Sequence, residues 1–441
     1  MPRAKLLPMD KADCGWYETL PPPAAANELV GDQRFDYAII GAGFAGLAAA
    51  RRLAQLLPEA AIALIEAQRV GFGSAGRNTG FMIDLPHDLA SDDYTGQQDA
   101  DRKLIRQNRS AIQFARETVR DNAIDCDWRE QGKLHGAVEP QGEAALRAFA
   151  DGLDALGEPV ARLDAADLKR ITGSDFYRSG VHTPGTVTIQ PAAFVRGCAA
   201  TLPENVTLFE NSPVGEFERQ PDGRIEIVCP RGRLSADKLL LTNNGYAASF
   251  GVKPGRLIHV CTYGSMTRPM SDAEAAQLGG DEHWALIPAN PLGSTVRRLA
   301  NGRIVIRNTF TWNRNYRYGE GQRVAMRRAH EASFRNRFPM LAELGFDYTW
   351  GGVLCLSRNN ANLFGELAEG VYGALCQNGL GVCRGTFSGR TLAELVAGDD
   401  NDFVRDMLAA PRPAACPPQP FLGLGVSATL AWKERRAGLE K

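Results

Sequence analysis

Apolar runs and helix-forming stretches alternate near the start of the chain. A short apolar run at residues 35–40 is followed by helix formers at 47–54. After a break at Pro58, a second apolar run occupies residues 61–67. Strand, helix and strand in this order are typical of a βαβ unit, in which two buried strands run parallel. The pattern therefore predicts an α/β fold that begins with a Rossmann-like layer.

The middle of the chain mixes helical and strand-like periods. Apolar residues three, four or seven positions apart predict amphipathic helices over residues 104–119 and 146–156. Short apolar runs predict strands at 206–209, 224–228, 238–242, 257–267 and 303–306. A further helix is expected to run through residues 386–398. These segments predict a second, mixed unit beside the first layer.

The turn after the first strand has the glycine spacing of a dinucleotide-binding loop. In GAGFAG, Gly41 permits a tight turn, Gly43 lets a pyrophosphate approach the backbone, and Gly46 lets the helix pack on the strand. The helix N-terminus favours an anion because its first N–H groups are unpaired. Glu66 ends the second strand, where a carboxylate can accept hydrogen bonds from ribose hydroxyls. This unit predicts a site for NAD or FAD, and the free carboxylate disfavours the 2′-phosphate of NADP.

A second glycine-rich segment, RVGFGSAGRNTGF at residues 69–81, directly follows the acidic strand. Successive backbone N–H groups of such a loop can form a nest that holds an anion, and Arg77 would add positive charge. An ordinary surface loop is the alternative, although its glycine content and lack of acidic residues are unusual for one. We expect this loop to wrap a pyrophosphate and the inner face of a ring system.

Composition narrows the function classes. The chain has 441 residues, 44% of them hydrophobic and 23% charged, as expected of a globular protein large enough for two domains. The formal net charge of -1 disfavours nucleic-acid binding, which depends on clustered Lys and Arg. No apolar run reaches the length of a signal-peptide core or a membrane span, so a cytoplasmic location is expected. The nine cysteines contain no CxxC pair, which predicts reduced thiols and no metal site.

Three segments together carry a resemblance to a known family. GAGFAG with Glu66, then GFGSAGRNTG, and far downstream QNGLGVCRGTFSGRTLAELVAGD at 377–399, resemble the FAD-dependent amine and D-amino acid oxidase superfamily. Within it, the chain is most similar to γ-glutamylputrescine oxidase and its relatives. The similarity extends over most of the chain, and it implies that the dinucleotide is FAD.

The resemblance implies a non-contiguous architecture. An FAD-binding domain of the glutathione-reductase and D-amino acid oxidase type is expected to carry an inserted substrate domain with an antiparallel sheet. We expect the FAD-binding domain at residues 33–86, 180–250 and 345–400, the substrate domain at 87–179 and 251–344, and tails at 1–32 and 401–441. The C-terminal tail contains a helical stretch, which could dock on the second domain or lie on a membrane surface.

The resemblance also implies which residues contact the cofactor. The expected contacts are Gly41, Gly43, Phe44, Ala45, Gly46, Glu66, Ala67, Gly73, Ser74, Arg77, Asn78, Thr79, Gly80, Val214, Asn243, Gly379, Leu380, Gly381 and Val382. Non-covalent FAD is favoured. Sarcosine oxidases of the same superfamily attach FAD through a cysteine in the general region of Cys355, so a thioether stays open as an alternative.

The resemblance implies an amine oxidation whose difficult step belongs to the flavin. A C–H bond next to an uncharged amine would deliver hydride to flavin N5, water would hydrolyse the imine, and O2 would reoxidise the flavin. Backbone N–H groups at residues 379–382 would stabilise the reduced ring. Leu380 stands where the family has a histidine beside the flavin, so the substrate of relatives does not carry over with the cofactor site.

Candidate catalytic and substrate-binding residues lie mainly in the second domain. Arg307 and Asn308, together with Leu380 of the glycine loop, are the catalytic candidates. Arg307 could bind a substrate carboxylate through two parallel hydrogen bonds, and Tyr263 and Trp284 could line the substrate. The alternatives are a surface strand position for Arg307 and core positions for the two aromatic residues.

Three function classes stay open. The first is an FAD-dependent oxidase of a primary or secondary amine, either a γ-glutamyl polyamine or an amino acid. The second is a flavin amine dehydrogenase that passes electrons to a quinone or a carrier protein. The third is an FAD-binding protein without turnover, for which Leu380 is the only hint. Steady O2 consumption with an amine separates the first class from the second, and the oligomeric state is not predicted.

Overall fold

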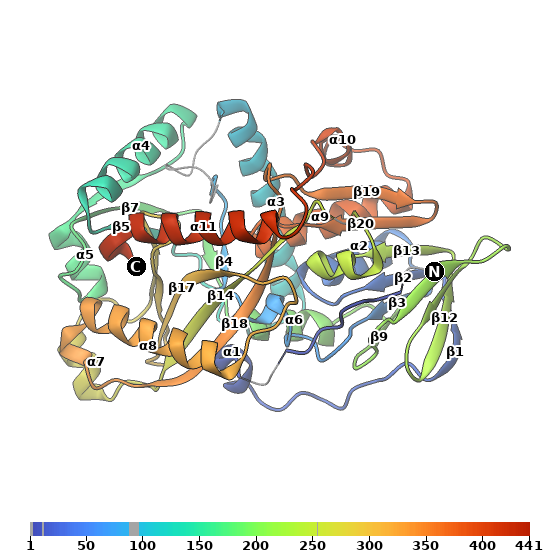
Figure 1. Ribbon diagram of the computed structural model, residues 1–441, viewed down its shortest axis with the longest axis horizontal. Coiled ribbons are helices and arrows are strands. Elements are labelled where there is room, and N and C mark those ends of the chain that lie inside the picture. Colours follow the sequence, from blue (N-terminus) through green and yellow to red (C-terminus); the bar gives the residue numbers. More distant parts are fainter. Residues whose placement is uncertain (1–2, 11–12, 88–96, 254) are drawn as a thin grey trace.

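The computed structural model describes residues 3–10, 13–87, 97–253 and 255–441. Two large sheets organise these residues, with the six-stranded sheet on the right of Figure 1 and the eight-stranded sheet on the left. Helices pack against both sheets. The mixed α/β fold class that the sequence predicts is therefore confirmed.

The six-stranded sheet contains the predicted βαβ unit. In spatial order its strands are β19 (Leu363–Ala368), β20 (Val371–Leu375), β13 (Lys238–Leu241), β2 (Tyr37–Ile40), β3 (Ile62–Ile65) and β9 (Val206–Phe209). Neighbours run parallel except for β19, which pairs antiparallel with β20. Parallel strands need cover on both faces, and the nearly continuous apolar sequences of these strands meet that need.

Each face of this sheet packs against a different layer. Ile39, Ile62 and Leu64 point to a helical layer that includes α2 (Phe44–Leu56) and α9 (Gly381–Ala397). Ala38 and Ala63, one position along, point to the opposite core. That core is shared with a four-stranded sheet of β1 (Gly31–Arg34), β12 (Gly232–Ala236), β11 (Ile225–Val228) and β10 (Glu216–Arg219). The two-residue period of the strands thus separates two hydrophobic cores.

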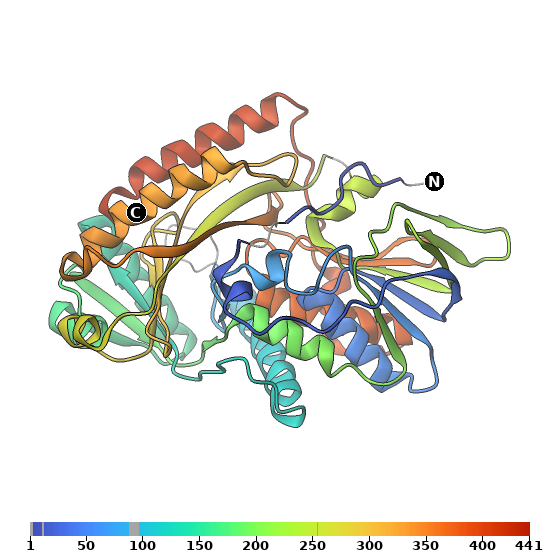
Figure 2. The ribbon, with the colours of Figure 1, turned by 90° about the horizontal axis from the view of Figure 1, so that it is seen from below.

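The eight-stranded sheet is mostly antiparallel. In spatial order its strands are β18 (Phe346–Leu356), β14 (Ile258–Thr267), β17 (Ile304–Trp312), β16 (Thr295–Arg298), β15 (Trp284–Pro288), β5 (Lys133–Ala137), β7 (Ser179–Thr183) and β6 (Ala161–Asp164). β5 and β15 pair in parallel. The helices α8 (Glu320–Arg337) and α11 (Phe421–Arg436) both pack against β17, and Figure 2 shows them lying over this sheet.

The remaining elements connect or cover the sheets. The helices are α1 (Gly15–Glu18), α3 (Gln98–Asp121), α4 (Pro140–Leu156), α5 (Ala165–Thr172), α6 (Pro191–Ala200), α7 (Asp272–Leu278) and α10 (Asp402–Ala409). The short 3-10 segments are η1 (Ser74–Gly76), η2 (Asn244–Phe250), η3 (Pro339–Leu341) and η4 (Gly438–Glu440), and β4 (Phe81–Met82) pairs with β8 (Val187–Thr188). Within the described residues, each helix is too short or too polar to cross a membrane.

The two amphipathic helices predicted from periodicity are present and longer than expected. The helix predicted at 146–156 begins at Pro140 and ends before Gly157. Proline suits the first turn of a helix because its missing N–H would be unpaired there. Gly157 has φ 76°, the left-handed conformation that closes a helix. The boundary signals therefore lie outside the apolar periodicity that predicted the helix.

Two segments that we expected in the FAD-binding domain belong to the eight-stranded sheet. β18 pairs with β14 along its length, so residues 346–356 belong to the eight-stranded sheet and not with the six-stranded one. Residues 180–183 of β7 also lie in the eight-stranded sheet. An apolar run predicts a strand but carries no information on which sheet the strand joins. The division into two domains stays a prediction, with these two boundaries moved.

The expected tails are folded parts of the molecule. Cys14, Trp16 and Tyr17 are buried in a cluster with Met266 and Trp350. At the other end, α11 docks on the eight-stranded sheet, the position that the sequence offered as an alternative to a membrane surface. Both expected tails therefore contribute to tertiary packing.

Candidate cofactor and substrate site

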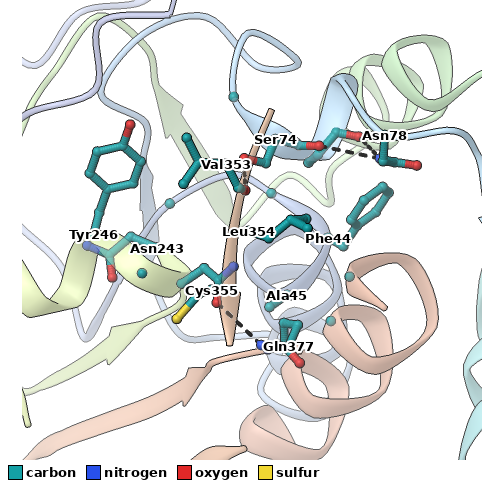
Figure 3. Close-up of a pocket in the computed structure, with 18 of the residues that line it drawn as sticks. Phe44, Ala45, Ser74, Asn78, Asn243, Tyr246, Val353, Leu354, Cys355 and Gln377 are labelled. Carbon is teal, nitrogen blue, oxygen red and sulfur yellow. Dashed lines mark hydrogen bonds between the residues drawn. The ribbon is translucent and has the colours of Figure 1, made fainter. Parts of the chain in front are cut away.

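A long cavity lies at the carboxyl ends of the parallel strands. Figure 3 shows part of it, with Asn243 and Tyr246 on one side and Phe44 and Asn78 on the other. The cavity brings together these predicted residues: Gly41, Gly43, Phe44, Ala45, Glu66, Ala67, Gly73, Ser74, Asn78, Thr79, Val214, Asn243, Arg307, Gly379, Leu380, Gly381 and Val382. The carboxyl edge of a parallel sheet is where open α/β folds bind ligands.

The first glycine turn has the geometry that its spacing predicts. Gly41 adopts φ +103°, and a Cβ there would lie 3.0 Å from the backbone of Asn243. A Cβ on Gly46 would lie 1.8 Å from Gly41 O, so this glycine lets α2 pack on the strand and does not line the cavity. A Cβ on Gly43 would meet only Ala75 Cβ, at 3.6 Å. The backbone at Gly43 thus faces open space at the N-terminus of α2, where an anion is favoured.

Glu66 is held at the end of β3 by backbone donors on two sides. Its Oε2 accepts a hydrogen bond from Ala42 N at 2.9 Å, and its Oε1 accepts one from Gln68 N at 3.1 Å. Burial raises the pKa of this carboxyl, and the two backbone hydrogen bonds act against that shift. Each oxygen keeps a further lone pair, so the oriented carboxylate can still accept hydrogen bonds from ribose hydroxyls.

The second glycine loop is closed by its own polar side chains. Ser74 Oγ donates to Val353 O at 2.7 Å, a bond drawn in Figure 3. Asn78 Nδ2 donates to Ala75 O at 2.6 Å, and Asn78 Oδ1 accepts from Gly80 N at 2.8 Å. The loop is therefore preorganised beside the cavity.

The third glycine loop leads into α9 and is shaped by Asn378. Ser357 N donates to Asn378 Oδ1 at 2.8 Å, and Asn378 Nδ2 donates to Ala361 O at 3.2 Å. Cys376, Asn378 and Gly379 all have positive φ, which turns the chain sharply before the helix. The helix starts without a side-chain cap, so its first N–H groups remain available at the cavity.

α2 and α9 pack closely, and both begin at the cavity. A Cβ on Gly389 would lie 2.0 Å from Ala45 O, and one on Gly385 would lie 3.2 Å from Phe44 Cβ. These glycines let the two helix axes approach, which brings two positive helix ends to one ligand. No acidic residue occupies the first turn of either helix.

Two buried side-chain amide oxygens in the wall have no hydrogen-bond partner among the described residues. They are Asn243 Oδ1 and Gln377 Oε1, and both residues line the cavity. A buried acceptor without a partner is costly unless a ligand or water satisfies it. Together with the open backbone at Gly43 and the oriented Glu66, these acceptors fit a dinucleotide that carries hydroxyl and N–H donors.

The part of the cavity away from Glu66, which we call the substrate end, is lined by an apolar cluster and by three polar side chains. Phe81, Ile83, Ile287 and Leu380 belong to a single apolar cluster that lines it. The polar side chains here are those of Arg307, Thr295 and His87. The Arg307 guanidinium lies 5.3 Å from the centroid of Phe310. Burial, together with nearby cations including Lys133 and Arg307, lowers the pKa of His87 and favours its neutral form.

The comparisons with known proteins agree with this geometry. The family model described as "DAO: FAD dependent oxidoreductase" matches residues 36–395. The chain belongs to this family of FAD-dependent oxidoreductases. It is 25% identical to γ-glutamylputrescine oxidoreductase of Escherichia coli, over 83% of this chain and 85% of the relative. A probable oxidoreductase OrdL of Haemophilus influenzae is 26% identical, with 83% of each chain covered.

Solved structures show the same fold. Glycine oxidase from Geobacillus kaustophilus superposes with a TM-score of 0.69 at 19% identity, covering 84% of this chain and 96% of that one. The family membership predicted from the glycine segments and Glu66 is confirmed, and FAD is the cofactor of this DAO-family enzyme.

Arg77 occupies a different place from the one expected. It does not line the cavity, and its buried guanidinium forms an ion pair with Asp13 at 2.9 Å and lies 3.8 Å from Asp10. It also donates to Tyr318 Oη at 3.2 Å. Gly80 is likewise outside the cavity, because a Cβ there would lie 2.1 Å from Ile189 O. The aspartates that engage Arg77 are more than sixty positions away in sequence, so the loop pattern did not reveal them.

Two expected substrate contacts and one expected catalytic residue lie in the core of this DAO-family enzyme. Tyr263 is fully buried and shares a 2.8 Å hydrogen bond with Thr311 Oγ1. Trp284 is buried against Phe338, with ring centroids 6.2 Å apart. Asn308 Nδ2 donates to Ser294 Oγ at 3.0 Å, away from the cavity. Successive strand residues point to opposite faces, so Arg307 and Asn308 could not both face the substrate.

Two polar residues that line the cavity, Thr295 and His87, were not predicted from the sequence, and they come from separate parts of the chain. Thr295 is the register partner of Arg307 in the adjacent strand, and its buried Oγ1 has no partner among the described residues. His87 follows the short strand β4. Only the strand register brings Thr295 beside Arg307, and the chain offers no spacing motif for it.

Cys355 lies in the wall of the cavity and is fully buried. A side-chain hydrogen bond with Cys376 and burial raise the pKa of its thiol well above the ordinary value. A thiol in this state carries little thiolate, which is the form needed to bond a flavin. The environment therefore favours the non-covalent cofactor.

Lys133 is a buried cation behind the substrate end. Its Nζ donates to Thr183 Oγ1 at 2.7 Å, and burial lowers its pKa to about 8. Between about pH 8 and its ordinary value of 10.5, the unfolded chain holds a proton that the folded chain has lost, so stability rises with pH in that window. Below pH 8 the buried charge costs about 3 kcal/mol.

We therefore expect Lys133→Met to raise the thermal midpoint near neutral pH. The gain should shrink as the pH approaches about 10, where wild-type Lys133 is neutral in the folded state. Thermal unfolding at about pH 7 and about pH 10 measures both values, with the exposed Lys169→Met as a control. A lower midpoint for Lys133→Met at about pH 7, with no loss at about pH 10, would contradict this expectation and show that the charge is stabilising.

Proposed function

We propose that this enzyme oxidises the C–N bond of an amine that also carries a carboxylate. The carrying observation is the charge of the substrate end, where Arg307 and the apolar cluster of Phe81, Ile83 and Ile287 line the same cavity. Among the described residues that line the cavity, the carboxylates are Asp10 and Glu66. Both lie near Gln68, at the end where Glu66 would meet the ribose, which we call the adenosine end. The described residues at the substrate end therefore include a cation, Arg307, and no carboxylate that could pair with a second ammonium group.

The roles of this chain's residues follow from that charge. FAD, when bound, supplies the acceptor for the electrons of the C–H bond next to the amine. Arg307 would bind the carboxylate bidentately and so orient the amine. Its positive charge and the apolar wall of Ile83 and Ile287 both disfavour an ammonium ion. The pocket thereby favours the uncharged amine, which is the reactive form.

Backbone N–H groups at the start of α9 would interact with the flavin ring. The unpaired N–H groups at the start of α9 lie beside Gly379 and Leu380 in the cavity wall. They would stabilise negative charge that develops on the ring, at no cost in reorganisation. Leu380 adds an apolar surface where family members have a histidine, so we propose that no proton is exchanged at this position.

We propose that FAD is held without a covalent bond. Acid precipitation of the purified holoenzyme should leave the yellow colour in the supernatant, because the buried Cys355 thiol is not ionised. Separation of the pellet and supernatant, followed by their absorption spectra, checks this expectation. Colour retained in the washed pellet would establish a covalent link.

We propose that O2 is the electron acceptor. We also propose that the enzyme is located in the cytoplasm. O2 uptake should be measured with two matched substrates, γ-glutamylputrescine and putrescine, which differ in the carboxylate-bearing γ-glutamyl group. Uptake with the first and not with the second supports both the carboxylate anchor and oxidase activity. Uptake with putrescine alone would contradict the anchor. Turnover that needs a quinone or an artificial acceptor would favour the dehydrogenase alternative.

A further inference from the structure

An extended N-terminal segment lies along the adenosine end of the cofactor cavity. In residues 3–10, exposed and half-buried positions alternate, so that Ala4, Leu6, Pro8 and Asp10 face inward. This two-residue period is that of an extended chain lying on a surface. Leu6, Pro8 and Asp10 line the same cavity as Glu66. Figure 2 shows the N-terminal end of the chain running beside η2.

Hydrogen bonds fix this segment at both of its ends. Ala4 N donates to Gly215 O at 2.7 Å, and Lys5 N donates to Ser249 O at 3.1 Å. At the other end, Asp10 and Gln68 exchange two bonds: Asp10 N donates to Gln68 Oε1 at 3.0 Å, and Gln68 Nε2 donates to Asp10 O at 3.1 Å. The anchors adjoin Val214 and Glu66, which mark the adenosine end of the site.

Arg77 provides a second anchor just beyond the segment. Its guanidinium pairs with Asp13 Oδ1 at 2.9 Å, and Tyr318 Oη donates to Asp13 Oδ2 at 2.9 Å. The buried arginine therefore ties the N-terminal chain to the second glycine loop and to the segment after β17. This explains why an arginine next to the cavity makes no contact with it.

We propose that residues 4–10 form part of the cofactor-binding site, as a strap that covers the adenosine end of bound FAD and slows its release. Leu6 and Pro8 would supply apolar surface toward the adenine, together with Val214 and Phe250 of the same cavity. FAD leaves this end only after the strap detaches from Gly215, Ser249 and Gln68. The family match begins at residue 36, so the strap lies outside the residues that the family model matches.

The test is the FAD dissociation rate, followed by flavin fluorescence after the holoenzyme is diluted far below its FAD dissociation constant. Deletion of residues 2–8 removes the apolar contacts and keeps the Asp10 and Asp13 anchors; it should raise the rate about tenfold or more. The double variant Leu6→Ala with Pro8→Ala should have an intermediate rate. Leu424→Ala, at an exposed position outside both the strap and the cavity, should release FAD like the wild type. A wild-type rate in the deletion variant would overturn the proposal.

Hydrogen exchange of the full-length chain keeps the proposal testable if the deletion variant does not fold. The amides of Ala4, Lys5 and Asp10 should exchange more slowly in the FAD-bound protein than in the apoprotein. Equal exchange in the two forms would overturn the strap. Neither readout depends on the substrate or on turnover, so a failure here is distinguishable from a wrong amine.

Discussion

Replacement of Arg307 by leucine should lower kcat/KM about 100-fold or more for a carboxylate-bearing amine. Arg307 lines the substrate end of the cavity together with Thr295, His87 and the apolar cluster. Loss of a charge-assisted bidentate contact in a partly buried site costs about 3 kcal/mol, and each tenfold change corresponds to about 1.4 kcal/mol. Steady-state kinetics with γ-glutamylputrescine or an amino acid would measure the loss.

A second variant and the visible spectrum distinguish loss of the carboxylate anchor from loss of FAD. Arg307→Lys keeps the charge but loses the fork of two parallel donors, so it should lie between the wild type and Arg307→Leu. The flavin content and visible spectrum of both variants should match those of the wild type, because Arg307 belongs to the substrate end of the cavity. Unchanged kcat/KM in Arg307→Leu would remove the carboxylate anchor from the account.

Replacement of Gly43 by alanine should weaken FAD binding at least about tenfold while the fold persists. The backbone at Gly43 has φ -85°, which any residue can adopt, and the added Cβ would meet only Ala75 Cβ at 3.6 Å. In the apoprotein the methyl group therefore has room. With FAD bound, it would occupy the space through which a phosphate approaches the helix N-terminus.

A matched glycine elsewhere controls for the substitution itself. Gly345 lies outside the cavity, and a Cβ there would have no neighbour within 4 Å. Gly345→Ala should bind FAD like the wild type, as measured by fluorescence titration of the two apoproteins. Equal affinity in Gly43→Ala would mean that the pyrophosphate does not pass this glycine. A lower apoprotein melting temperature in Gly43→Ala alone would reveal an unexpected cost to the fold.

The cofactor end of the site was largely predictable because its parts lie close together in the sequence. The glycines at 41, 43 and 46 and Glu66 belong to one local βαβ unit, in which spacing determines geometry. The same holds for Asn78, whose hydrogen bonds stay within its own loop, whereas Ser74 donates to Val353 of the distant strand β18. The resemblance added the distant loop at 379–382, which spacing alone does not connect to the first glycines.

The substrate end and the strap were beyond prediction because long-range packing decides them. Arg77 carries the charge expected of a phosphate ligand, yet Asp10 and Asp13 engage it from the N-terminal segment. Tyr263 and Trp284 have the composition of a substrate wall, but strand register directs both into the core. Periodicity predicts a strand and its alternation, whereas register and sheet membership come from tertiary contacts.

The most direct test of the central account is an anaerobic titration of the purified holoenzyme, followed by its visible spectrum. γ-Glutamylputrescine, sarcosine and D-alanine carry a carboxylate next to or near an amine, whereas putrescine and other polyamines do not. An oxidised flavin band that bleaches with at least one of the first group, and with none of the second, is the predicted result. Admission of air should then restore the band. A protein that cannot be reconstituted with FAD, or a flavin that only free polyamines bleach, would contradict the account.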